Sequence, residues 1–178
     1  FHPVVGVGKN PTVPSLIAPN TASTILYCTA CHASDGANAP AGPHGSIYPQ
    51  ILKKQYLTTD GGTNTTGTTE SAQAYELCYS CHNRTWLMNP DNSANTFMYH
   101  YKHVVEKCTP CNSCHDPHGI NAAQGGNSVN NAHLINFRAS VVTKSDNGQG
   151  PFYQSTSPRS EEHTSELQSP CNLVCRLL

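Results

Sequence analysis

One five-residue pattern occurs three times in this chain: two cysteines separated by two residues, with a histidine directly after the second. It stands at residues 28–32, 78–82 and 111–115. Two thiols at this spacing can bond to the two vinyl groups of one porphyrin, and the histidine can then bind the iron. The pattern therefore indicates three covalently attached c-type haems. The attaching thiols would be Cys28, Cys31, Cys78, Cys81, Cys111 and Cys114. The proximal ligands would be His32, His82 and His115.

Each iron of this kind also takes a sixth ligand, and histidine is the best supplied residue type. The chain has only two methionines but ten histidines. We therefore expect bis-histidine coordination, which gives lower reduction potentials than an axial methionine does. The expected distal ligands are His44, His103, His118 and His133.

The surroundings of these histidines support the choice, although an isolated histidine is more often a surface residue than a ligand. His44 lies in a Gly-Pro-His-Gly run that can form a tight turn. His118 follows the third pattern so closely that it would serve a neighbouring haem. We place His103 ahead of its neighbour His100. His2 is a further candidate, for a haem of its own chain or of a second copy.

Composition argues against a large apolar core. Only 37% of the residues are hydrophobic, and the chain contains 13 glycines and 13 prolines. A chain of this composition needs additional cross-links or cofactors to fold stably. We expect a mostly irregular fold with short α-helices and little β structure, organised around haems. Helical character is expected at residues 47–57 and 71–82, and a strand at residues 133–142.

Charge and hydropathy exclude two classes of partner. The formal net charge of −1 gives no indication of nucleic-acid binding. The sequence contains no run of about 20 apolar residues, so no membrane span is expected. Because c-type haems are attached outside the cytoplasm, we expect an exported protein of a bacterium or archaeon, located in the periplasm or outside the cell.

Residues 159–178 look foreign to the rest of the chain. A short-read sequencing adapter encodes residues 159–169 in one reading frame, and its constant continuation encodes residues 172–178. We exclude this segment from functional assignment, together with His163, Cys171 and Cys175. Residues 1–158 are then expected to form a single multihaem domain that is truncated at its C-terminal end. Cys108 remains a cysteine with no assigned role.

The chain resembles exported multihaem c-type cytochromes over about residues 28–137. The likeness is strongest to small secreted members with the segments K-H-V-V-E, T-P-C-x-x-C-H-D-P-H-G and H-L-I-N-F, found here at residues 102–106, 109–119 and 133–137. It implies electron transfer without catalysis, redox protein partners, and a fourth haem in the intact protein. Some relatives polymerise into extracellular filaments, which would make a homopolymer through haem contacts a further expectation.

Two other functions fit part of the pattern. A multihaem oxidoreductase would need one iron with an open coordination position, and the surplus of histidines argues against it. A zinc-binding module could use the cysteine pairs, but it would leave the histidine after every second cysteine unexplained.

Overall fold

The computed structural model describes residues 2–4, 6, 8, 10–59, 69–91, 99–119 and 134–138. Within these ranges the chain is mostly irregular, with short helices and no regular strand, which confirms the expected fold class in its coarse form. The helical elements in chain order are η1 (Cys28–Ala30), η2 (Pro49–Ile51), α1 (Glu76–Tyr79), α2 (Arg84–Leu87), η3 (Tyr101–Glu106) and η4 (Cys111–Ser113). None of the described helices combines the length and the apolar character that crossing a bilayer requires.

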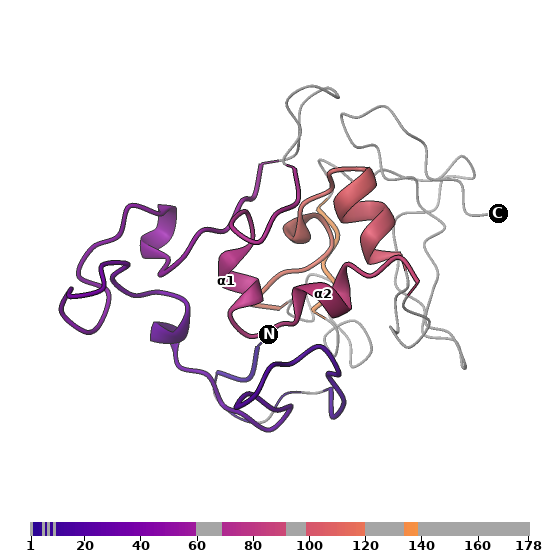
Figure 1. Ribbon diagram of the computed structural model, residues 1–178. Coiled ribbons are helices and arrows are strands. Elements are labelled where there is room, and N and C mark those ends of the chain that lie inside the picture. Colours follow the sequence, from indigo (N-terminus) through magenta and orange to yellow (C-terminus); the bar gives the residue numbers. More distant parts are fainter. Residues whose placement is uncertain are drawn as a thin grey trace.

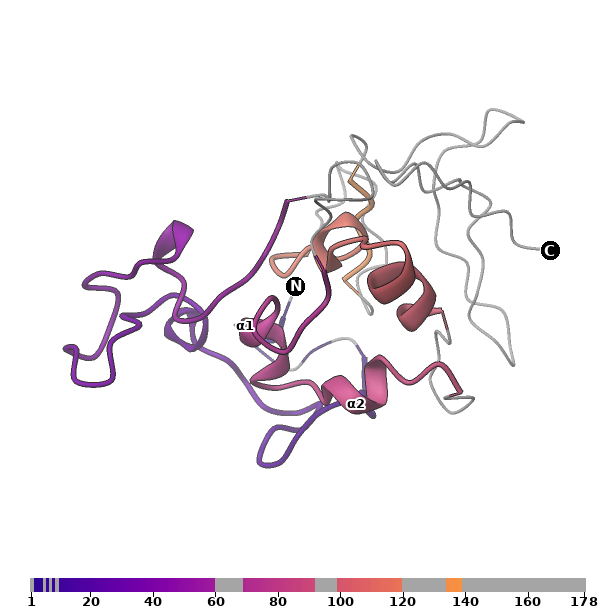
Figure 2. The ribbon, with the colours of Figure 1, turned by 45° about the horizontal axis from the view of Figure 1, so that its top comes forward.

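The helices fall into two regions of the molecule. The segment that carries η1 and η2 extends to one side, and α1, α2 and η3 lie together in the larger part of the ribbon (Figures 1 and 2). The two regions are connected by extended chain rather than by a shared sheet. Every described β contact is an isolated bridge between single residues.

The apolar core of the described residues is small. Its packed cluster consists of Ala74, Tyr75 and Val104, which join the turn before α1 to the π-helix η3; Ala33, Leu52 and Ile135 are buried elsewhere. The cysteines Cys78 and Cys111 pack against this cluster. Two of the three cysteine-histidine patterns therefore begin directly on the core.

Three local expectations need correction. The helix expected at residues 71–82 is confined to α1, with turns before it. The helical character expected at residues 47–57 shrinks to η2, because Gln50 and Ile51 take positive φ angles of 57° and 54° and the chain is extended from Leu52. The described part of the expected strand, residues 134–138, makes one isolated bridge; the rest of that strand lies outside the described residues.

Candidate haem sites

The three cysteine-histidine patterns adopt the same turn. In each pattern the carbonyl of the first cysteine accepts hydrogen bonds from the N–H groups of the second cysteine and of the histidine. The three bonds from the histidines measure 2.8 Å to Cys28, 3.0 Å to Cys78 and 2.9 Å to Cys111. Residues three and four apart in a helical turn share one face, so the turn places both cysteines and the histidine on one face of the segment, as attachment to a single ring requires.

Each of the three turns is hydrogen-bonded to a separate segment of the chain. The proximal histidines form antiparallel bridges with one apolar residue each: His32 with Leu52, His82 with Leu16, and His115 with Ile135. In all three cases the residue after the apolar one donates its N–H to the carbonyl of the second cysteine, at 2.8 to 2.9 Å. The donors are Lys53, Ile17 and Asn136. The sequence shows no repeat in these supporting segments, yet the structure repeats the same support three times.

The supporting segments also orient two of the imidazoles. His32 donates a hydrogen bond from Nδ1 to the carbonyl of Gln50 at 2.8 Å, which leaves the lone pair on Nε2. Nδ1 of His82 is hydrogen-bonded to the buried hydroxyl of Ser15, also at 2.8 Å. Burial lowers the pKa of His82 to about 4, so its ring is neutral at physiological pH. A neutral imidazole fixed through Nδ1 is the form that binds a metal through Nε2.

Two proximal histidines face a second imidazole. The rings of His32 and His118 have their centroids 6.0 Å apart with planes 11° from parallel. The rings of His100 and His115 have their centroids 6.2 Å apart with planes 22° from parallel. Asp116 holds the backbone of His118, whose N–H donates to Oδ1 at 2.9 Å. The pair His32–His118 joins two segments that are far apart in the sequence. The pair His100–His115 joins the two ends of one stretch of chain.

The thiols of different patterns lie close to one another. Cys78 and Cys111 are joined by a hydrogen bond between their sulfurs, and with burial this bond raises the pKa of Cys111 well above its ordinary value. Burial also raises the pKa of Cys31, with further contributions from the neighbouring Cys81 and Cys78. None of these cysteines is in a disulfide in the described residues. The three attachment sites therefore converge.

Two of the sites have apolar or aromatic side chains nearby. Beside η1 and η2, Tyr27 is 76% exposed and Ile47 is 82% exposed, and Cys28 is exposed with them. At the third site a pocket of about 310 Å³ opens beside His115. Tyr56, Pro117 and Phe137 line it together with polar and charged residues, namely Thr58, Asn112, Asp116, Asn136 and Arg138. Both places offer apolar contact next to a cysteine pair and a histidine.

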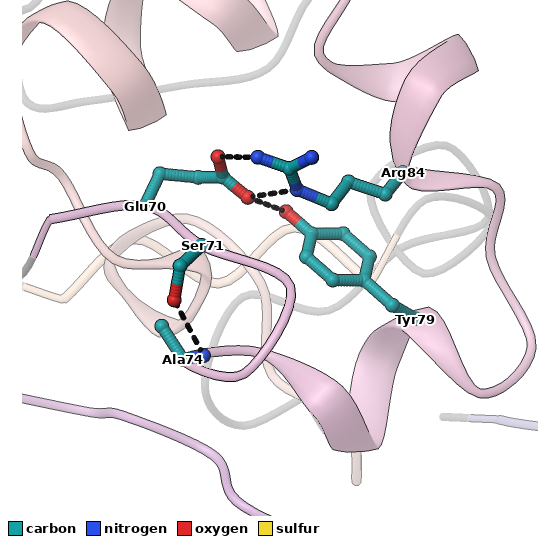
Figure 3. A network of polar contacts seen from close by, with 5 residues as sticks. All are labelled: Glu70, Ser71, Ala74, Tyr79 and Arg84. Atoms are coloured by element: carbon teal, nitrogen blue, oxygen red, sulfur yellow. Dashed lines mark hydrogen bonds and ion pairs between the residues drawn. The ribbon is translucent and has the colours of Figure 1, made fainter.

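A buried carboxylate fixes the second site (Figure 3). Glu70, whose side chain is 3% exposed, accepts two hydrogen bonds from Arg84, from Nε at 2.8 Å and from Nη2 at 2.6 Å. It also accepts the hydroxyl of Tyr79 at 2.8 Å. Burial alone would raise the pKa of Glu70, but the bonds from Arg84 and Tyr79 outweigh burial and hold it below its ordinary value. Because Tyr79 lies between Cys78 and Cys81, this network ties the second pattern to α2.

The structure places the four expected distal ligands in different surroundings. His118 lies against a proximal histidine as described above. His44 is exposed in a turn beside Gly42, which has a φ of 102°. His103 is buried on η3, where its Nδ1 donates to the carbonyl of Tyr99 at 2.9 Å. His133 lies outside the described residues.

One ring in the two pairs was not expected from the sequence. His100 pairs with His115, although sequence reasoning preferred His103 on the same short segment. The two histidines are three residues apart, so they lie near one face of a helix, and no local pattern distinguishes them.

Comparison with protein-family models, with curated proteins and with solved structures gave no match for this chain.

Proposed function

We propose that this protein transfers electrons through three covalently attached c-type haems with two histidine ligands each. The observation that carries the proposal is the geometry of the pairs His32–His118 and His100–His115. Two imidazoles bound on opposite faces of one metal ion, each about 2 Å from it through nitrogen, have centroids about 6 Å apart. Separations of 6.0 and 6.2 Å fit that requirement.

The convergence of the attachment sites supports transfer between haems. The sulfurs of Cys78 and Cys111 are in contact, so groups bound to the second and third patterns would be neighbours. Cys31 is near Cys78 and Cys81, which would bring the first group close to the second. The haems would supply the redox chemistry, and the chain would supply attachment, axial ligands and spacing. The small core of Ala74, Tyr75 and Val104 agrees with a fold that haems complete.

Two alternatives remain open to test. An oxidoreductase would leave one iron open, whereas the two histidine pairs favour six-coordinate iron. A zinc module would gather cysteines and histidines around one ion. In the part of the chain that the structure describes, no three His, Cys, Asp or Glu side chains are grouped in that way.

Location and assembly belong to the same proposal. Covalent haem attachment implies export to the periplasm or beyond the cell, with redox proteins as partners. A fourth haem would belong to the intact protein. A homopolymer would use the apolar side chains exposed beside η1 and η2, including Ile47.

Haem content provides the direct test. The protein is produced in a host that attaches c-type haems, and its mass and pyridine haemochrome spectrum are measured. We expect three haems for each chain. A colourless protein with the mass of the bare polypeptide, or one that carries zinc instead, would refute the proposal.

Cysteine variants give this measurement a matched control. The double variant Cys111→Ser/Cys114→Ser should lose one haem and keep two. Cys108→Ser alters a cysteine three residues before Cys111 that is outside every pattern, and it should keep all three haems. Carbon monoxide should not bind the reduced protein, because six-coordinate iron does not take it up. Binding of carbon monoxide would instead indicate an oxidoreductase with an open position on one iron.

A further inference from the structure

A short segment near the start of the chain is anchored on both sides of the second proximal histidine. The carbonyl of Ser15 accepts the N–H of Asn83 at 2.6 Å. Two residues further on, Ile17 donates its N–H to the carbonyl of Cys81 at 2.8 Å. These two bonds are made to the residues on either side of His82, so the backbone of Ser15 has a fixed place next to that histidine.

The side chain of Ser15 is directed at the imidazole. Ser15 is only 5% exposed, and its Oγ lies 2.8 Å from Nδ1 of His82. When a histidine binds a metal through Nε2, its Nδ1 carries the proton and donates it to a neighbouring acceptor. The hydroxyl oxygen of Ser15 is therefore the acceptor that His82 would use in the loaded protein.

The first proximal histidine has a different acceptor in different surroundings. Nδ1 of His32 donates to the backbone carbonyl of Gln50 at 2.8 Å, and both Gln50 and Cys28 are exposed. An amide carbonyl is a stronger acceptor than a hydroxyl, because resonance places negative charge on its oxygen. The hydroxyl of Ser15, by contrast, is buried.

Both differences act on the reduction potential in the same direction. A stronger acceptor on Nδ1 makes the imidazole a better electron donor to the iron and so lowers the potential. Solvent beside a haem also stabilises the oxidised iron, which carries the greater charge. The acceptor and the exposure at His32 therefore both favour a lower potential than those at His82.

We propose that Ser15 is a positioning residue that sets the reduction potential of the second haem through His82 and leaves it above the potential of the first haem. The inference rests on the proposed haem function and adds an order to it. Electrons that enter the chain would occupy the second haem before the first. Ser15 acts through the ligand, so haem attachment and the low-spin state do not depend on it.

The test is a redox titration of the full holoprotein and two variants. Ser15→Ala should keep three low-spin haems and raise the potential of one of them, because His82 loses its acceptor and becomes a weaker donor to the iron. The electron paramagnetic resonance signal of one haem should shift as well. Ser15→Thr keeps the hydroxyl and should restore both properties. Unchanged potentials in Ser15→Ala would overturn the inference.

Ser71→Ala is the matched control. The hydroxyl of Ser71 accepts the N–H of Ala74 at 3.0 Å in the turn before α1, so this variant removes a bond to the backbone near the same pattern (Figure 3). It should leave all three potentials unchanged. An equal shift in Ser71→Ala would show that loosening of the second site, and not the contact to His82, changes the potential.

Cysteine variants identify which haem responds. The component lost in Cys78→Ser/Cys81→Ser should have a higher potential than the component lost in Cys28→Ser/Cys31→Ser. Adding Ser15→Ala to Cys78→Ser/Cys81→Ser should not change the two remaining haems. The reverse order of potentials, or a shift that persists without the second haem, would overturn the inference. If the unaltered protein carries no haem, the proposed function fails; if it carries three whose potentials Ser15→Ala does not change, this inference alone fails.

Discussion

The ring centroids of His118 and His32 lie 6.0 Å apart, with ring planes only 11° from parallel. His118 belongs to the segment after the third pattern and His32 to the first, so one pair joins the neighbourhoods of two patterns. The distance is too long for rings in direct face-to-face contact, where atoms meet at about 3.5–4 Å, and it lies within the range of about 4.5–7 Å that offset-stacked rings show. It suits two rings with one metal ion between their nitrogen atoms.

Removal of the distal ring should therefore open one iron. We expect His118→Ala to keep three haems but to make one of them high-spin and reactive with carbon monoxide. His118→Met should retain a low-spin haem with a raised potential, because methionine replaces one imidazole. Electron paramagnetic resonance and redox titration would measure both. Unchanged spectra in His118→Ala would mean that the two rings are neighbours and not ligands.

The two histidines near η3 allow a direct comparison. His100 faces His115, whereas His103 is buried and donates to Tyr99. We expect His100→Ala to open the iron that His115 holds. His103→Ala should leave all three haems low-spin and lower the free energy of unfolding by about 1–3 kcal/mol, because it removes a buried ring and its hydrogen bond. The opposite result would restore the preference that the sequence suggested.

Sequence spacing picked out the three cysteine-histidine patterns but not the ring pairs. Thiol and imidazole spacing within five residues is a local property, so the patterns can be recognised from residue types alone. The pairing of His100 with His115 depends on how distant segments pack. The strand expected at residues 133–142 had the right β-branched composition, but Leu134 takes a φ of 59° and breaks the extended chain beside Ile135.

The supporting residues were not predictable for a similar reason. Ser15 and Gln50 orient proximal imidazoles, one through its hydroxyl and the other through its carbonyl. Every residue has a backbone carbonyl, so a contact to a carbonyl cannot be predicted from residue types. A single serine is common in any loop and does not stand out either. The coarse fold followed from composition, since few apolar residues and many Gly and Pro favour short helices joined by irregular chain.

The Glu70 network should make stability depend on pH in the acid range. A carboxyl whose pKa is lowered on folding stabilises the protein above the ordinary value of 4.5, and this contribution is lost as pH falls through the folded pKa. We expect Arg84→Ala to reduce the free energy of unfolding by about 2 kcal/mol at pH 7, because it leaves a buried carboxylate without its main partner. Glu70→Gln should remove this part of the acid dependence.

A second ion pair provides the control for that prediction. Lys54 and Glu76 are 3.0 Å apart, but their side chains are 37% and 43% exposed. Pairs exposed to this extent contribute about 0–1 kcal/mol. Chemical unfolding of Lys54→Ala should therefore differ little from that of the unaltered protein. Equal losses in Lys54→Ala and Arg84→Ala would show that the burial of Glu70 is not what matters.

The turn at Gln50 combines backbone strain with a contact to His32. Gln50 has a φ of 57°, which is unfavourable for residues with a Cβ atom, and its carbonyl accepts the proton of His32 Nδ1. Gln50→Gly keeps the carbonyl and removes the Cβ atom. We expect it to raise the free energy of unfolding by about 0.5–1 kcal/mol and to leave the haem potentials unchanged.

Two further substitutions at this position separate strain from ligand orientation. Gln50→Ala keeps a Cβ atom and should be neutral. Gln50→Pro fixes φ near −65°, so the turn cannot form and the carbonyl moves away from His32. That variant should lose stability and should also change the potential of one haem, because the hydrogen bond on Nδ1 tunes the ligand. If the potential stays constant in Gln50→Pro while the protein remains folded, the carbonyl does not orient His32.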